Sequence, residues 1–465
     1  MKKYLIRSGI TPLQTFTPAE MIVRNSIGGN VGNLVYAYSV YRTLMTDDDV
    51  TFDADNYHIN PDRADYINEN YDAYIIPLAD AFRSDFISSM KKYTKLIKKL
   101  KIPVYIIGVG LRTTFEPKPD DKFEFDDVVR DFIKAVLEKS TMVGVRGQIT
   151  ADYLSRLGFR EGKDHMAIGC PSMYSFGREL TIRDTTITPE SMVTVNSSRL
   201  SPKNVLDFIT RSMDEFPDHY FIPQWLKEMR LTYIGFPNIP KIEHNNYPGK
   251  ITDDVYVNNR VRYFLNVPTW LDFLKQADFS FGARLHGNIA ATIAGTPSLL
   301  IPKDGRMREL TEYHHLTHIW AKDIDDNTNI WDVIEKLDFH EVSKYQGANF
   351  DRYIDFLNTN KIDHIYKNGN NPARVPLDDA IAKVNLQPPI QSIASCDVQE
   401  AIKRFETLTT LEQQAKAKKG NSKDKEQYHN ILAEKDKQIK YLQGTLNRKS
   451  VRTALKVANM FASKK

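Results

Sequence analysis

Short apolar runs alternate with helical patterns along the first part of the chain. Asp72–Pro77, Ile102–Gly108 and Ser140–Val145 are rich in β-branched and aromatic residues, which predicts buried strands. Phe82–Leu100 carries apolar residues at helical spacing, and Gln148–Leu157 predicts a helix that ends at a glycine. Strands and helices that alternate in this way predict βαβ units and a parallel sheet.

The alternation begins again after a polar, proline-containing stretch around residue 185. Met192–Asn196 and His219–Pro223 predict strands on either side of a helix over Pro202–Glu215. Ala277–Pro302 predicts a buried strand, a tight turn, a helix of small residues and a second buried strand. The second half is therefore expected to form a parallel sheet of its own.

The length of the chain predicts more than one domain, because 465 residues are too many for one ordinary hydrophobic core. The expected fold class is α/β, with one domain over residues 1–185 and a second over residues 186–365. Residues 366–396 are expected to be a linker, and residues 397–465 a basic helical extension.

Charge is distributed unevenly. Residues 397–465 hold 16 Lys and Arg against 8 Asp and Glu, a net +8, whereas the whole chain carries +4. The body therefore carries −4, which argues against nucleic acid as a partner. In the tail, Leu432, Ile439, Leu442 and Leu446 predict a short coiled coil. The basic amphipathic segment 448–465 predicts a helix that binds an anionic membrane surface or a partner helix.

Other sequence features concern the compartment and metals. No apolar run reaches the roughly 18 residues of a transmembrane helix, and the first residues lack a segment of signal-peptide length. Two cysteines, Cys170 and Cys396, cannot build a disulfide scaffold. The pair His314–His315 lacks a carboxylate at ligand spacing, so no metal is expected. A cytoplasmic protein is predicted, with peripheral binding at the inner face of the cell membrane as an option for the tail.

The turn within Ala277–Pro302 carries the most specific chemistry. It places Arg284 and His286 between the end of a strand and the start of a helix. Free backbone N–H groups and the helix dipole favour anions at such a position in α/β folds. We interpret it as an anion-binding turn; the alternative is a buried histidine beside an unrelated surface arginine.

Arg146 holds the equivalent place in the first half, directly after a predicted strand. Two α/β domains present their strand ends to a shared cleft, so Arg146 is expected to converge with Arg284 and His286 on one anionic ligand. A basic cluster after the next strand either adds a cation to this cleft or is a solvated surface group: Lys303, Arg306 and Arg308.

A glycine-rich loop precedes an apolar helix near the start of the chain. Glycines there permit close backbone approach and are expected to leave N–H groups free for a ligand. The loop matches neither a dinucleotide fingerprint nor a P-loop. Its candidate binding residues are Gly28, Gly29, Asn30, Gly32 and Asn33.

In combination, these motifs resemble the polysaccharide pyruvyl transferase family. The matching features are the Gly28–Asn33 loop, Val145-Arg-Gly-Gln-Ile-Thr-Ala-Asp-Tyr-Leu with Gly158, Gly169-Cys-Pro-Ser172, and Arg284-Leu-His-Gly followed by Gly295-Thr-Pro. The resemblance runs from about residue 25 to 340 and implies two Rossmann-like domains in a GT-B-type arrangement. It also implies transfer of pyruvate from phosphoenolpyruvate to sugar hydroxyls of a cell-surface polysaccharide or its precursor, which leaves a ketal.

The resemblance further implies roles for individual residues. His286 and Arg284 are expected to be catalytic, with His286 as an imidazolium that protonates the enol methylene carbon. The expected substrate-binding residues are Arg146, Arg306, Gly28, Gly29, Asn30, Gly32, Asn33 and Gly287. No metal or cofactor is implied; the partners are phosphoenolpyruvate as donor and a glycan or lipid-linked saccharide as acceptor.

The chain departs from the family pattern at three places. Asn33 stands where the family usually has Asp, and Gly147 and Gln148 follow Val-Arg where an acidic residue is common. Arg306 stands where Lys is frequent. Two other functions stay open: a GT-B glycosyltransferase that uses a nucleotide sugar, and a non-catalytic subunit of a polysaccharide assembly complex.

Overall fold

The computed structural model describes residues 2–118, 120–240 and 246–417. The chain up to Arg404 forms one compact unit, and the chain from Phe405 onwards forms a second. Residues 398–417 are helical, which confirms a helical C-terminal region. The coiled coil and the basic helix predicted further along lie outside the described residues.

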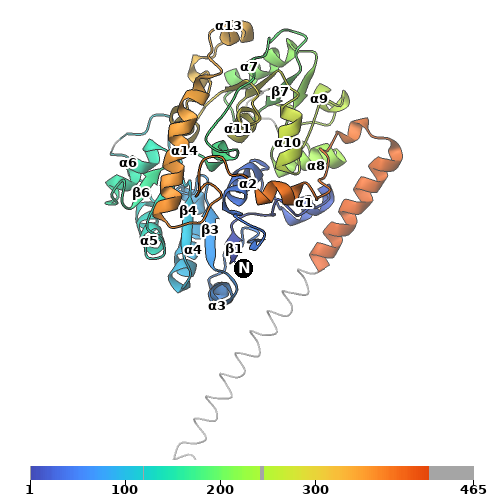
Figure 1. The fold of residues 1–465 in the computed structure, drawn as a ribbon. Helices are drawn as coiled ribbons and strands as arrows, with labels where there is room; N and C mark the ends of the chain where they lie inside the picture. The colour runs from blue at the N-terminus through green and yellow to red at the C-terminus, as the bar shows by residue number, and fades with distance from the viewer. Residues whose placement is uncertain (1, 119, 241–245, 418–465) are drawn as a thin grey trace, which may run out of the picture. The chain divides into compact units, whose positions relative to one another are not determined.

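A parallel sheet of four strands forms the centre of the first half (Figure 1), in the order β2-β1-β3-β4. Its strands are β1 (Lys2–Ile6), β2 (Val50–Ala54), β3 (Ala73–Pro77) and β4 (Val104–Ile107). A parallel pair, β5 (Val143–Val145) and β6 (His165–Ala167), joins this sheet through a bridge between Val109 and Val145. The strands predicted at β3, β4 and β5 are confirmed, whereas β1, β2 and β6 were not predicted.

Amphipathic helices of the first half, such as α4 and α5, turn an apolar stripe towards the strands, whereas α2 is buried on almost all sides. In α4, for example, Met90, Tyr93 and Ile97 are buried while the lysines at its other face are exposed. The helices are α1 (Pro18–Arg24), α2 (Gly32–Leu44), α3 (Ala64–Asn70), α4 (Ile87–Lys99), α5 (Asp126–Leu137) and α6 (Gln148–Arg156).

A second parallel sheet, in the order β10-β9-β7-β8, forms the centre of the other half. Its strands are β7 (Val193–Asn196), β8 (His219–Phe221), β9 (Phe279–Gly282) and β10 (Ser298–Leu300). Its helices are α7 (Lys203–Asp214), α8 (Leu226–Ile234), α9 (Asp254–Val257), α10 (Val267–Leu274), α11 (Leu285–Ile293), α12 (Gly305–His314) and α13 (Ile330–Glu335). The predicted strand-turn-helix-strand unit over Ala277–Pro302 is thus confirmed as β9, α11 and β10.

The chain after the second sheet returns to the first half. α14 (Glu341–Thr359) runs back along it in Figure 1, and the Asn360 side chain then accepts hydrogen bonds from the amides of Thr141 and Met142, both at 3.0 Å. The stretch expected to be a linker contains α15 (Pro376–Ile381). The predicted domain limits at residues 185 and 365 stay predictions.

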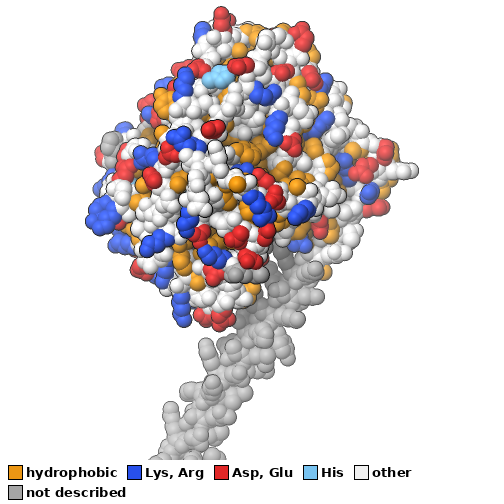
Figure 2. All heavy atoms as spheres, in the orientation of Figure 1, with side chains coloured by type: hydrophobic (Ala, Val, Ile, Leu, Met, Phe, Trp, Pro, Cys, Tyr) orange, Lys and Arg blue, Asp and Glu red, His pale blue; other side chains and the backbone are white. Residues whose placement is uncertain are grey.

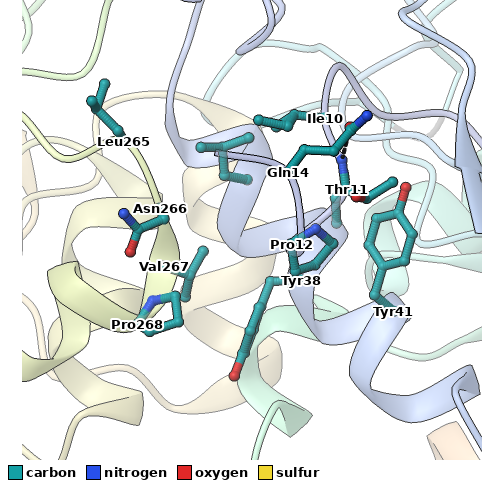
Figure 3. Close-up of a pocket in the computed structure, with 12 residues that line it drawn as sticks. Ile10, Thr11, Pro12, Gln14, Tyr38, Tyr41, Leu265, Asn266, Val267 and Pro268 are labelled. Atoms are coloured by element: carbon teal, nitrogen blue, oxygen red, sulfur yellow. Dashed lines mark hydrogen bonds between the residues drawn. The ribbon is translucent and has the colours of Figure 1, made fainter. Parts of the chain in front are cut away.

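The seam between the halves contains the small pocket drawn in Figure 3. Tyr38 and Tyr41 from α2 line it together with residues 10–12 and Gln14, opposite Val267 and Pro268 at the start of α10. Its cavity of about 30 Å³ has room for a water molecule or two, which is too little for a substrate. We therefore regard it as packing between the halves.

The predicted α/β class with two Rossmann-like parallel sheets is confirmed. On the face shown in Figure 2, basic and acidic side chains are interspersed over the body. Within the described residues, no helix is both long enough and apolar enough to cross a membrane.

Candidate functional site

The carboxyl edge of the second sheet opens into a cavity of about 430 Å³, here named the basic chamber. Its wall includes Arg284 and His286 at the start of α11, Lys303 just after β10, and Arg306 near the start of α12. Among the described residues no side chain caps α11, so its first N–H groups and its dipole add to the positive potential. The chamber therefore suits an anionic ligand.

Arg284 is held in one orientation by buried partners. Its Nε donates to the carbonyl of Ser197 at 2.7 Å, and its Nη2 donates to Glu228 Oε1 at 3.3 Å. Its guanidinium lies 4.2 Å from the centre of the Trp225 ring. Glu228, which is fully buried, also accepts the backbone N–H of Trp225 at 2.8 Å and the hydroxyl of Tyr247. Arg284 is thus preorganised before any ligand arrives.

His286 is neutral at pH 7 when only protein groups surround it. Burial lowers its pKa, the charges of Arg146 and Arg306 lower it further, and Asp80 offsets only part of this, so that the pKa is about 3. Its Nε2 is buried and has no hydrogen-bond partner among the described residues. The imidazolium expected from the sequence therefore needs negative charge from a ligand.

Arg146 is completely buried rather than part of either cavity wall. Its Nε donates to the carbonyl of Gly108 at 3.3 Å, and its guanidinium lies 5.8 Å from the centre of the Tyr36 ring. Tyr36 in turn meets His286 edge to face, with ring centres 6.1 Å apart. Both Nη atoms of Arg146 lack a hydrogen-bond partner among the described residues. Arg146 thus acts on His286 through its charge.

A second cavity of about 600 Å³, here named the polar chamber, lies at the carboxyl edge of the first sheet. Arg7 follows β1, Asn56 and Tyr57 follow β2, and Asp80 follows β3, so three strand ends contribute to its wall. The residues that line both chambers are Asn30, Asp80, His286 and Arg306. The two chambers therefore adjoin at His286, as expected for the cleft of a GT-B-type arrangement.

Asp80 is a site residue that the sequence analysis missed. Its carboxylate pairs with Arg306 at 3.2 Å and with Arg83 at 3.0 Å. Burial alone would raise its pKa, but Arg306, Arg83 and Arg146 lower it to about 2. A permanent carboxylate thus lies where the chambers adjoin. The available signal was a charged residue just past a buried strand, the same signal that identified Arg146.

The glycine-rich loop does not present free amides, contrary to the expectation. Every backbone N–H over Gly28–Leu34 donates to another atom of the protein. Val31 donates to the carbonyl of Gln224 at 2.9 Å, and Leu226 donates to the carbonyl of Gly29 at 3.0 Å. The loop thus bonds the first half to the second beside the site.

Glycines of the predicted site allow close packing around His286. A Cβ on Gly32 would lie 2.8 Å from the Cβ of His286, and one on Gly287 would lie 2.5 Å from Nε2 of Gln224. Asn30 lines both chambers, and Gly28 and Asn33 line the polar chamber together with Arg306. Gly29 lines neither.

Two residues of the basic cluster after β10, Lys303 and Arg306, line the cleft, and the third, Arg308, does not. Lys303 lines the basic chamber, and its Nζ donates to Ser201 Oγ at 3.0 Å. Burial, followed by the charge of Arg284, lowers the pKa of Lys303 to about 7. Arg308 instead pairs with Glu312 at 2.7 Å, outside both chambers. The cluster thus contributes two basic side chains, Lys303 and Arg306, to the cleft.

The sequence of the chain matches one known protein family. A family model described as polysaccharide pyruvyl transferase matches residues 30–304, which is more than half of the chain. The chain belongs to the polysaccharide pyruvyl transferase family. The matched range includes the loop at Asn30, Asp80, Arg146 and the Arg284-Leu-His-Gly turn.

The solved structures that the chain is similar to match it at low identity and with TM-scores below 0.5. An uncharacterised protein of Klebsiella pneumoniae is 13% identical, with 69% of this chain and 92% of that chain covered and a TM-score of 0.37. The UDP-GlcNAc 2-epimerase of Methanocaldococcus jannaschii is 12% identical, with 77% and 99% covered and a TM-score of 0.42. The glycosyltransferase SnogD of Streptomyces nogalater is 12% identical, with 76% and 95% covered and a TM-score of 0.31. No curated protein matches the chain.

Two departures of this pyruvyl transferase family member have structural explanations. Asn33 Nδ2 donates to the carbonyl of Ile27 at 2.9 Å, which an aspartate could not do. A Cβ on Gly147 would lie 2.6 Å from Cγ of Glu309, so the missing side chain leaves room for a carboxylate from α12. Glu309 accepts the N–H of Thr150 at 2.6 Å, and burial raises its pKa to about 7.

The sequence predicts no metal at the site, and the structure bears on this prediction only over the residues that it describes. Within the described ranges, no three His, Cys, Asp or Glu side chains gather as a metal-binding set. The cations of the site that the structure describes are arginines and one lysine.

Proposed function

We propose that this protein transfers pyruvate from phosphoenolpyruvate to a saccharide and forms a ketal, with the donor bound in the basic chamber. The observation that carries the proposal is the grouping of Arg284, Lys303 and Arg306 around His286 at the start of α11, in a chain of the pyruvyl transferase family. Phosphoenolpyruvate carries a carboxylate and a phosphate, and arginine binds both through paired hydrogen bonds.

The first step is a proton transfer from His286. The negative charges of the donor raise the pKa of the imidazole, so that it is protonated in the complex. It donates this proton to the methylene carbon, which becomes a methyl group, while the neighbouring carbon becomes electrophilic. A sugar hydroxyl attacks that carbon and returns a proton to the imidazole.

The second step releases phosphate. The bond between the electrophilic carbon and the phosphate oxygen breaks, and its electron pair leaves with the phosphate. A second hydroxyl of the same sugar attacks and closes the ketal, and its proton leaves with the phosphate. Arg284 and Arg306 stabilise the charge that develops on carboxylate and phosphate. Asp80 orients Arg306 through their ion pair.

The test combines ligand binding with turnover of labelled phosphoenolpyruvate. Phosphoenolpyruvate at a hundred times its Kd should stabilise the protein by about 2.7 kcal/mol in thermal unfolding, and nucleotide sugars should not. His286→Gln should lower turnover by about 10²–10⁴-fold. His315→Gln is the matched control, because His315 lies outside both chambers.

Each alternative function has its own result in this test. Stabilisation by a nucleotide sugar but not by phosphoenolpyruvate would favour a glycosyltransferase. Stabilisation by neither class would favour a non-catalytic subunit. A His286→Gln variant with near-normal turnover would exclude the acid role of this residue.

The location of the protein is a separate proposal. We propose a cytoplasmic protein whose tail binds an anionic membrane or a partner helix near a lipid-linked or polymeric acceptor. Deletion of residues 418–465 should abolish co-sedimentation with anionic vesicles and leave turnover of a soluble acceptor unchanged. Retained sedimentation would assign membrane binding to the body.

A further inference from the structure

The polar chamber and the basic chamber approach His286 from the carboxyl edges of different sheets. If the donor occupies the basic chamber, the second substrate can reach His286 and Asp80 through the polar chamber. We infer that the polar chamber is the acceptor site, and that it takes a saccharide that carries a phosphate or carboxylate group. This inference rests on the proposed function, because it assigns the donor to the other chamber.

The charge of the polar chamber indicates an anionic group on the ligand. Among the described residues its wall carries one aspartate, Asp80, and four arginines: Arg7, Arg24, Arg83 and Arg306. The wall is thus positively charged within a body whose net charge is −4. A neutral sugar would not need this excess of positive charge.

Two of these arginines have no carboxylate within 4 Å among the described residues. Arg7 donates through Nε to the Tyr93 hydroxyl at 3.0 Å and through Nη1 to the carbonyl of Pro77 at 3.2 Å, and it lies 4.9 Å from the centre of the Tyr57 ring. Arg24 is exposed, and its guanidinium lies 4.6 Å from the centre of the Phe16 ring. Their charge is therefore available to a ligand, whereas Arg83 is paired with Asp80.

The remaining wall suits the hydroxyl groups and the flat faces of a sugar. Four asparagines line the chamber together with Tyr57 and Phe86: Asn25, Asn30, Asn33 and Asn56. Asn56 and Tyr57 have φ angles of 55° and 56°, a conformation that is rare for a bulky residue such as tyrosine. The turn presses the Tyr57 ring towards Gly28, where a Cβ would come within 2.6 Å. Backbone strain of this kind is found at ligand sites.

The size of the polar chamber agrees with the larger of the two substrates. Its volume is about 600 Å³, against about 430 Å³ for the basic chamber. A saccharide with a charged substituent is larger than phosphoenolpyruvate, so the volumes of the two chambers agree with this assignment of donor and acceptor.

The experiment is a calorimetric titration of the full-length protein with three probes, in the presence and absence of saturating phosphoenolpyruvate. The probes are N-acetylglucosamine 1-phosphate, glucuronate and neutral N-acetylglucosamine. We expect at least one charged probe to bind about tenfold or more tightly than the neutral sugar, and to bind while phosphoenolpyruvate is present. Comparing the affinities of the two charged probes shows whether the chamber prefers a phosphate or a carboxylate on the sugar.

Substitutions of Arg7 and Arg24 test whether these two arginines bind the charged probe. Arg24→Gln and Arg7→Gln should each weaken the charged probe about tenfold or more and leave the affinity for phosphoenolpyruvate unchanged. Arg24→Lys keeps the charge and should retain most of the affinity. Arg24 is exposed, so its variants should fold even if Arg7→Gln does not.

Three results would overturn the inference. These are equal binding of the neutral and charged sugars, no binding of any probe at millimolar concentration, and competition of the charged probe with phosphoenolpyruvate for one site. Failure of phosphoenolpyruvate itself to bind is a different result, because it refutes the proposed function and leaves the sugar titrations readable.

Discussion

Binding of phosphoenolpyruvate should add a proton to His286. With protein groups alone its pKa is about 3, because burial and the charges of Arg146 and Arg306 disfavour the imidazolium. To serve as an acid at pH 7 the residue must gain about 4 pKa units in the complex, or about 5 kcal/mol of interaction with the donor.

The donor can supply interaction of this size. One unit charge at 4 Å contributes about 4 kcal/mol at an effective dielectric constant of about 20. Phosphoenolpyruvate brings a carboxylate together with a phosphate, so its charges exceed what the shift requires even if other cations share them. The sign follows from linkage: a ligand that raises the pKa of a group above the ambient pH takes up a proton as it binds.

The assay is calorimetric titration with phosphoenolpyruvate at about pH 6, one unit below the pKa of about 7 required in the complex, in buffers of different ionisation enthalpy. The dependence of the observed enthalpy on the buffer gives the number of protons taken up. Wild type should take up about one proton more than His286→Gln. The difference between the two proteins cancels any proton that the phosphate itself exchanges.

His315→Gln should match the wild type in this assay. Equal proton uptake by wild type and His286→Gln, at comparable affinity for phosphoenolpyruvate, would refute the reasoning. In that case His286 stays neutral in the complex and another group donates the proton.

Three further outcomes are expected. Burial raises the pKa of Glu309 to about 7 from an ordinary value of 4.5, so its contribution to stability is complete below pH 4.5 and is lost as the pH rises through 7. Urea unfolding should show this loss, about 3 kcal/mol, in wild type and not in Glu309→Gln. Asn33→Asp should lower the free energy of unfolding by about 1–3 kcal/mol at pH 7, because it places a carboxylate against the Ile27 carbonyl. Gly32→Ala, which adds a carbon 2.8 Å from the His286 Cβ, should lower kcat about tenfold to a hundredfold with a smaller effect on phosphoenolpyruvate affinity.

Each of these outcomes has a contrary result. An unchanged pH profile in Glu309→Gln would mean that this carboxyl is ionised at pH 7. If Asn33→Asp unfolded at the same urea midpoint as the wild type, the hydrogen bond from Asn33 to the Ile27 carbonyl would be dispensable. Asn33→Ala is the comparison that removes this bond without adding a charge. A normal kcat for Gly32→Ala would show that the position of His286 tolerates displacement.

The strands and helices around the Arg284-Leu-His-Gly turn could be predicted because hydrophobic periodicity is a local property. The unit β9, α11 and β10 lies within Ala277–Pro302, and its apolar runs are buried on both faces. β2 was not predicted, since only its first residue, Val50, is buried and its sequence does not form an apolar run.

The site was only partly predictable because its groups meet across long separations in the chain. Asp80 becomes a site residue through Arg306, which lies 226 positions away. The complete burial of Arg146 depends on how Tyr36 and Gly108 pack around it, which no local pattern records. For the same reason the loop amides were wrongly expected to be free, since Gln224 accepts one of them.

The two backbone hydrogen bonds between the loop and the segment at Gln224–Leu226 also restrict how the cleft can move. Further contacts between the halves lie close to the same place: the ion pair of Asp80 with Arg306 and the hydrogen bond from the Thr150 amide to Glu309. A change in the angle between the halves would have to strain or break these bonds. The spacing of His286, Asp80 and Arg306 is therefore coupled to the angle between the halves.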